Sequence, residues 1–157
     1  MPAAARRWLG LAGWLALSLL VAVSGMAFQP GAWYAALDKP PWTPPDWLFP
    51  PAWTLLYTLM AIAAWQVWLR AGLAGARLAL GLYLLQLAFN AAWSWLVFGL
   101  HRLDLGLVDV VLMWLAIAAT LVAFWRIHRM AALLLAPYLV WVTYAAALNH
   151  ALWRLNA

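Results

Sequence analysis

Carboxamide and aromatic side chains recur at helical intervals along one apolar stretch of the chain. Gln86, Asn90 and Trp93 stand at positions i, i+4 and i+7, so a helix would carry all three on one face. Two carboxamides facing lipid would be costly, and this face is therefore expected to point towards other helices. Two interpretations stay open: hydrogen bonds that join helices, worth about 0.6 kcal/mol per contact, and the polar floor of a ligand cavity.

Two further apolar stretches carry aromatic residues in the same way. Trp141, Ala145 and Asn149 are spaced four residues apart, and Trp53 and Tyr57 share one side of an earlier stretch. Small residues beside such rings either let helices approach closely or leave room for a planar ligand. The pattern alone does not choose between the two.

Asp109 is the only carboxylate that falls inside a predicted membrane span. A buried acid in a membrane is a candidate functional group. Its position near the end of the span favours a structural role instead. We expect it to cap loop backbone or to pair with Arg102 or Lys39.

The sequence contains no recognisable catalytic motif. It has no cysteine, and its three histidines, His101, His128 and His150, fall in separate loops or helix ends. A shared metal site is therefore not expected. A glycine-rich phosphate loop and a nucleophile elbow are also absent from the sequence. We assign no catalytic residue, no metal ligand and no obligatory cofactor.

The composition indicates an integral membrane protein. Of 157 residues, 69% are hydrophobic and 8% charged, and a soluble protein of this size needs a more charged surface. The basic residues lie in short loops, so they bear on membrane topology and do not indicate nucleic-acid binding. We predict an all-α fold, a single bundle over residues 1–157. Its five transmembrane helices are expected at about 8–28, 51–69, 78–98, 105–125 and 130–153.

The first apolar run has some features of an export signal, because Arg6 and Arg7 precede it and small residues follow. The uncharged stretch Trp8–Phe28 is nevertheless long enough to span a ~30 Å hydrocarbon layer. We expect a retained first helix.

The connecting loop, residues 29–50, differs sharply from the runs on either side. Residues 29–53 contain seven of the nine prolines, four of the fourteen tryptophans and the only lysine. Proline removes a backbone donor and clashes with the preceding helical turn, so this segment cannot continue a helix. We expect a semi-rigid lid over one end of the bundle, with a short helical piece near Trp33–Leu37.

The distribution of basic residues predicts the topology. Six arginines fall on one side of the predicted bundle without an acid, and Lys39, Arg102 and Arg154 fall on the other. Basic loops stay in the cytoplasm, so the N-terminus is expected inside and the connecting loop outside, if the membrane is a bacterial inner membrane. The six arginines are Arg6, Arg7, Arg70, Arg77, Arg126 and Arg129.

Long ordered motifs in this chain resemble a known family. The first motif is Trp33-Tyr34-Ala35-x-Leu37-x-Lys39-Pro40-x-Trp42-x-Pro44-Pro45-x-Trp47, followed by Pro51-x-Trp53-x-x-x-Tyr57. Later ones are Gln86-Leu87-x-x-Asn90-x-x-Trp93, Phe98-Gly99, Asp109, Pro137-Tyr138-x-x-Trp141 and Leu148-Asn149. Over residues 10–155 the chain resembles bacterial-type members of the translocator protein / tryptophan-rich sensory protein (TspO/MBR) family.

The resemblance implies a five-helix bundle, usually a homodimer in the lipid bilayer, that binds planar hydrophobic ligands beneath its first loop. Porphyrins, including protoporphyrin IX and haem-type tetrapyrroles, are the ligands it implies. Sterol binding is doubtful, because His150 and Ala151 stand where sterol-binding members carry a tyrosine before the basic residue. Together with the helix faces described above, the family resemblance gives these expected ligand-binding residues: Tyr34, Trp53, Tyr57, Gln86, Asn90, Trp93, Trp141 and Ala145.

Three functions are compatible with such a pocket. We favour a receptor or sensor that binds porphyrins without turnover and regulates tetrapyrrole levels or stress signalling. The alternatives are a light-dependent porphyrin-degrading enzyme, with Trp53 and Trp141 as electron donors, and a passive porphyrin or lipid transporter. The sequence carries no charge relay of the kind that active transporters use.

Overall fold

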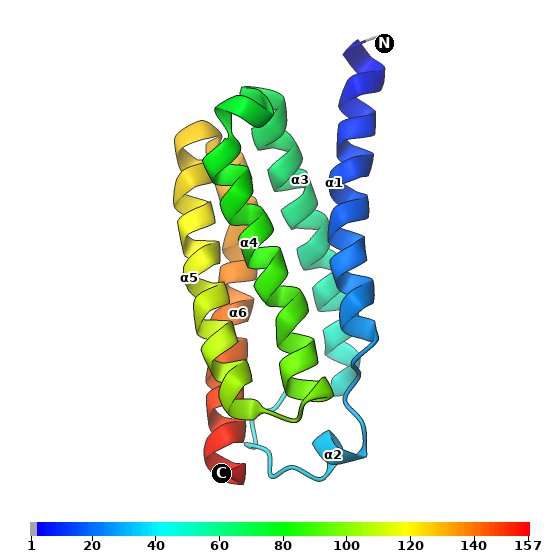
Figure 1. Ribbon diagram of the computed structural model, residues 1–157, viewed down its shortest axis with the longest axis vertical. Coiled ribbons are helices and arrows are strands. Elements are labelled where there is room, and N and C mark those ends of the chain that lie inside the picture. The colour runs from blue at the N-terminus through cyan, green and yellow to red at the C-terminus, as the bar shows by residue number, and fades with distance from the viewer. Residues whose placement is uncertain (1–2) are drawn as a thin grey trace.

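The apolar runs fold into five long helices (Figure 1). The computed structural model describes residues 3–157, and no strand occurs among them. Helices satisfy their backbone hydrogen bonds internally, which suits runs this apolar to lipid. The helices are α1 (Ala3–Met26), α3 (Phe49–Gly75), α4 (Arg77–Ser94), α5 (Leu103–Ile127) and α6 (Arg129–Asn156). With α4 extended by the π-helical turn η2 (Trp95–Gly99), all five are long and apolar enough to cross a membrane, which confirms the predicted fold class.

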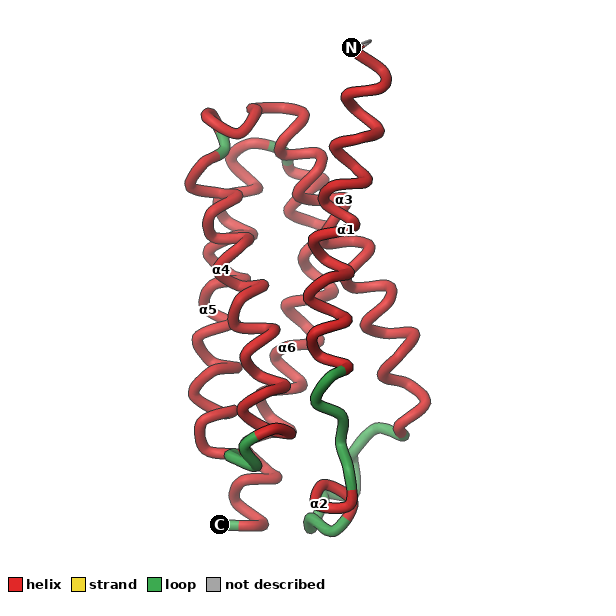
Figure 2. The backbone as a smooth tube through the Cα atoms, turned by 45° about the vertical axis from the view of Figure 1, so that its right-hand side comes forward, coloured by secondary structure: helices red, strands yellow, loops and turns green. Residues whose placement is uncertain are grey.

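The helices pack side by side along a common direction (Figures 1 and 2). α5 packs against α4 and α6, α3 packs against α6 and α1, and α1 also touches α4. The helix α1 lies at the edge of the bundle and is the least enclosed of the five. The largest fully buried side chains include Tyr83, Tyr138, Phe124 and Met60, so the core is built from rings and long apolar chains of four helices.

Two turns between helices are tighter than the sequence suggested. The predicted linker at residues 70–77 is mostly helical, because α3 continues to Gly75. Gly72 alone leaves the helical region, with φ 67°, which a residue without a Cβ adopts easily. Between α5 and α6 only His128 is non-helical, and its Nδ1 accepts a hydrogen bond from the backbone N–H of Ala131. That imidazole caps α6 and lets the chain reverse within one residue.

The connecting loop lies across the end of the bundle that also carries the C-terminus (Figure 2). It contains two short helical pieces, α2 (Ala32–Ala35) and the 3₁₀ turn η1 (Asp46–Leu48). The helical piece expected near Trp33–Leu37 is therefore present, but it begins one residue earlier and ends two residues earlier. Proline explains why the rest of the loop is not helical, since the proline pairs at 40–41 and 44–45 lie in non-helical backbone.

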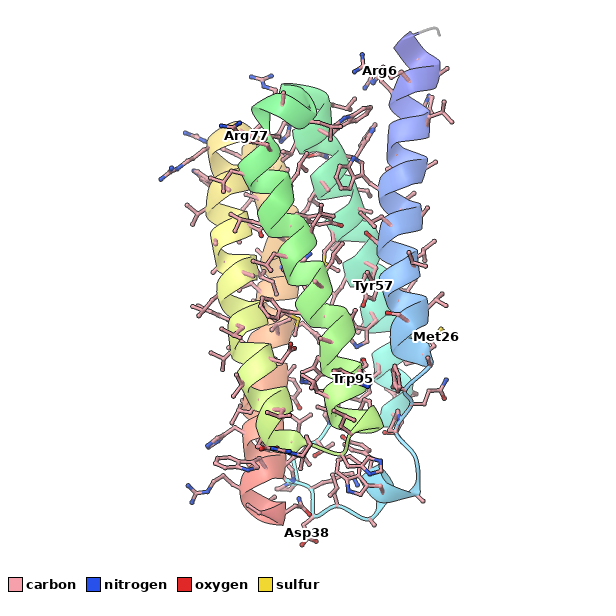
Figure 3. All side chains as sticks on the ribbon, in the orientation of Figure 1. Arg6, Met26, Asp38, Tyr57, Arg77 and Trp95 are labelled. Carbon is pink, nitrogen blue, oxygen red and sulfur yellow. The ribbon has the colours of Figure 1, made fainter. Side chains whose placement is uncertain are left out.

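Charged groups separate between the two ends of the bundle. Arg6 and Arg77 both lie at one end of the bundle, and Asp38 lies at the opposite end (Figure 3). This arrangement follows the predicted division of basic residues between the two sides. The chain is a multi-pass protein, and the six arginines without an accompanying acidic residue lie at one end of its helices. Which side of the membrane each end faces stays a prediction.

Candidate functional site

Asn90 joins three helices at the centre of the bundle. Its Oδ1 accepts a hydrogen bond from the hydroxyl of Tyr57 at 2.5 Å, and its Nδ2 donates to the hydroxyl of Tyr138 at 2.8 Å. The Tyr138 hydroxyl in turn donates to the Met113 sulfur at 3.5 Å. All of these side chains are buried. The prediction that Asn90 faces inwards is confirmed, and one amide N–H of Asn90 is left for a further partner.

A cluster of aromatic rings lies against this network. The Trp53 indole meets the rings of Tyr57, Tyr138 and Trp141 at centroid distances of 5.5, 6.3 and 6.2 Å. Phe49, from the first turn of α3, meets the Trp141 ring edge to face at a centroid distance of 5.9 Å. Four residues of the expected site therefore come together here, namely Trp53, Tyr57, Asn90 and Trp141; Figure 3 marks Tyr57. We call these four residues and Tyr138 the aromatic chamber.

Trp93 and Tyr34 belong to a second cluster nearer the connecting loop. The Trp93 Nε1 donates to Asn149 Oδ1 at 3.0 Å, and Asn149 Nδ2 donates to the Leu103 carbonyl at 2.8 Å. The ring of Phe98 meets Trp93 and Tyr34 edge to face, each at 5.5 Å. Burial, reinforced by the Asp46 carboxylate, raises the pKa of Tyr34, so its phenol stays protonated at neutral pH.

Gln86 and Ala145 lie apart from these contacts. Gln86 is buried one turn from Asn90, and its Nε2 approaches the Met60 sulfur at 3.9 Å while its Oε1 has no partner. The inward direction predicted for Gln86 is confirmed. Ala145 is partly buried on α6, one turn beyond Trp141. Their role towards a ligand stays a prediction.

The connecting loop is fastened to the bundle at three places. The Asn156 side chain accepts from Asp38 N–H and donates to the Asp38 carbonyl, both at 2.9 Å. The Tyr144 hydroxyl donates to the Trp42 carbonyl at 2.7 Å. At the other side of the loop, Trp33 stacks on the imidazole of His101 at a centroid distance of 4.3 Å. The loop is thus held by side chains of α6 and of the turn before α5.

Asp109 is buried, and its Oδ2 has no hydrogen-bond partner. The expected pairing with Arg102 or Lys39 is wrong. Arg102 binds the nearer Asp104 on the surface, with N–O distances of 2.8 and 2.5 Å. Lys39 donates to the carbonyls of its own loop and lies over the Tyr34 ring. Both cations therefore find partners closer in sequence than Asp109.

A surface hollow of about 230 Å³ lies between α5 and α6, and its lining is almost entirely apolar. None of the expected ligand-binding residues lines it, so we do not assign it to the site. Within residues 3–157, no three His, Cys, Asp or Glu side chains are placed to share a metal ion. The residues that line the hollow are Val111, Trp114, Thr143 and Ala146.

Comparison with known proteins decides the family. The description "TspO/MBR family" matches residues 6–154 of this sequence. The chain belongs to the TspO/MBR family. The resemblance inferred from the sequence motifs is thereby confirmed, and family membership agrees with the prediction of a multi-pass integral membrane protein.

Relatives within this family come from bacteria and from animals. Protein CrtK of Rhodobacter capsulatus is 48% identical over 137 residues, which is 85% of this chain and 84% of the relative. The tryptophan-rich sensory protein of Cereibacter sphaeroides is 46% identical over 135 residues, 86% of this chain and 84% of the relative. The translocator protein of Homo sapiens is 43% identical over 126 residues, 79% of this chain and 75% of the relative.

Proposed function

We propose that this TspO/MBR protein is a membrane receptor for porphyrins and related hydrophobic tetrapyrroles, which it binds in the aromatic chamber beneath the connecting loop. Through occupancy of that site it regulates tetrapyrrole levels or stress signalling. The observation that carries the proposal is the convergence of Trp53, Trp141 and Asn90 from three helices. Family membership supports it, since sensory and translocator proteins are among the relatives.

The chemistry of the chamber suits a planar apolar ligand with a few polar edges. Indole rings offer flat apolar faces on which a tetrapyrrole plane can stack. Most pockets of this kind are apolar, with a small number of placed polar groups that fix orientation. Asn90 supplies such a group, because the second N–H of its amide can donate to a propionate or carbonyl oxygen.

Ligand entry requires rearrangement of the chamber. Trp53 and Trp141 touch each other edge to face, with an interplanar angle of 81°, so a stacked ligand must separate them. The connecting loop above is held by polar contacts that are largely exposed, which are weak in water. We infer that the loop opens by releasing these contacts and that the two indoles then part around the ligand.

The test is a titration of the detergent-purified protein with protoporphyrin IX, followed by quenching of the fourteen tryptophans. Wild type is compared with the double variant Asn90→Ala/Trp141→Ala. Trp125→Ala is the matched control, because that indole is half-exposed near the opposite end of α5. The proposal predicts saturable binding that is lost only in the double variant. Equal quenching of all three proteins would mean partitioning into detergent and would contradict it.

A second candidate function rests on the contact between Trp53 and Trp141. Two indoles within one chamber could supply electrons to a photoexcited porphyrin, which would make the protein a light-dependent porphyrin-degrading enzyme. Illumination of the bound protein separates this candidate from binding alone. A new porphyrin product that is absent from Trp53→Phe and Trp141→Phe would favour the enzyme. Unchanged porphyrin absorption after illumination would exclude it.

A further inference from the structure

The unpartnered carboxylate of Asp109 lies between the two hydrogen-bonded clusters of the site. Gly106, three residues earlier on α5, is so close to the Trp93–Asn149 pair that a Cβ there would lie 3.0 Å from Asn149 Oδ1. Met113, four residues later, accepts the hydrogen bond from Tyr138. Residues three and four apart share a helix face, so Asp109 lies on α5 between both contacts. The two contacts are about 10 Å apart along the helix axis.

The neighbouring polar groups leave Asp109 without a partner. Asn149 uses its Oδ1 for Trp93 and its Nδ2 for the Leu103 carbonyl. The Asn90 carboxamide is hydrogen-bonded to the hydroxyls of Tyr57 and Tyr138. Only 6% of the Asp109 residue is exposed, and Oδ2 is fully covered. A buried polar oxygen with no partner is costly, which makes a position like this one a candidate for contact with a ligand group.

Three charged side chains of this end have partners other than Asp109. Arg102 and Asp104 bind each other outside the bundle, and Lys39 binds loop carbonyls. His101 stacks on Trp33. The groups that approach Gly106 and Met113, on either side of Asp109 along α5, are neutral: the side chains of Val97, Asn149 and Trp93, and the phenol of Tyr138. No cation of the described residues 3–157 pairs with the carboxylate.

We propose that Asp109 is a specificity residue of the chamber, which selects hydrophobic ligands that present a protonated amine or another strong hydrogen-bond donor towards α5. Trp93 and Tyr138 supply aromatic rings on the two sides of this position, and such rings attract organic cations. The same carboxylate repels anions, so a porphyrin with propionates binds with them turned away from α5. The inference rests on the proposed function, because it assigns the chemistry of one wall of the same chamber.

The test uses three porphyrins that differ only in the groups at two side chains: protoporphyrin IX, its neutral dimethyl ester, and its bis(2-aminoethyl) amide, which carries ammonium groups. Each is titrated into wild type, Asp109→Asn and Asp104→Asn. Asn keeps the shape of Asp and removes the charge. Asp104→Asn is the matched control, because it removes the same charge from the exposed first turn of α5.

The proposal predicts that wild type and Asp104→Asn bind the ammonium derivative at least about tenfold more tightly than the ester, as expected for a hydrogen bond between charged groups. In Asp109→Asn this preference disappears, and protoporphyrin IX binds as well as or better than it does to wild type. An equal preference in wild type and Asp109→Asn would overturn the inference while leaving porphyrin binding in place. Failure of all three porphyrins to saturate wild type would overturn the proposed function and this inference with it. The preference in wild type is a readout that does not depend on the folding of any variant.

Discussion

Asn156 and Asp38 are 118 residues apart in sequence, and the carboxamide of one pairs with both backbone polar groups of the other. The pairing resembles one rung of a β-ladder, made by a side chain in place of a second strand. It ties the connecting loop to the last turn of α6. Because α6 also carries Trp141, the loop and the aromatic chamber share one supporting helix.

Asn156→Ala should loosen the connecting loop without unfolding the bundle. Two exposed hydrogen bonds are worth about 1–2 kcal/mol together, so opening of the loop should become about tenfold more frequent. Hydrogen exchange of the loop amides measures this. Arg154→Ala, an exposed change two residues away, is the control and should leave exchange unchanged. Equal protection of the loop in both variants would show that the pairing does not hold it.

Gly10 permits the close contact between α1 and α3. A Cβ at this position would lie 2.1 Å from the Trp68 ring, whereas nothing lies within 4 Å of a Cβ built on Gly13. Gly10→Ala should therefore force Trp68 and α1 apart and lower stability by about 1–3 kcal/mol, as overpacking does. Gly13→Ala is the matched control and should be neutral or slightly stabilising, since alanine favours helix. Thermal unfolding in detergent compares them, and equal melting temperatures for both variants would refute the contact.

The hydrogen bond between Tyr57 and Asn90 should contribute measurable coupling. A double-mutant cycle with Tyr57→Phe and Asn90→Ala isolates the pair. Within membranes such contacts average about 0.6 kcal/mol, and a coupling energy of about that size is expected for this buried pair. Unfolding in detergent gives the three free-energy differences. A coupling energy of zero would mean that the two groups find other partners once separated.

The helices and their inward faces could be predicted because the membrane leaves few alternatives. A run of about twenty apolar residues must be helical, and a carboxamide such as Gln86 must turn from lipid. Helical periodicity predicted which residues share a helix face, and the family resemblance joined residues of different helices into one site. The structure brings four of them together, namely Trp53, Tyr57, Asn90 and Trp141. Their role towards a ligand stays a prediction.

Other contacts could not be predicted from the sequence, because they join residues that only the folded chain brings together. The pairing of Asn156 with Asp38 joins distant segments, and no periodicity relates them. Tyr138 lies at the centre of the hydrogen-bond network, although the sequence analysis placed it only in the motif Pro137-Tyr138-x-x-Trp141. For Asp109 the expected ion pair failed because Arg102 reaches Asp104 two residues away, a local geometry that a count of charges does not reveal.

The central claim is that a porphyrin occupies one defined site in the aromatic chamber. Induced circular dichroism in the Soret band tests this most directly, because an achiral porphyrin acquires a signal only when a chiral site holds it. The account predicts a signal that saturates at about one porphyrin per chain, persists in Trp125→Ala, and is lost in Asn90→Ala/Trp141→Ala. A missing signal, or one equally strong in the double variant, would contradict the account.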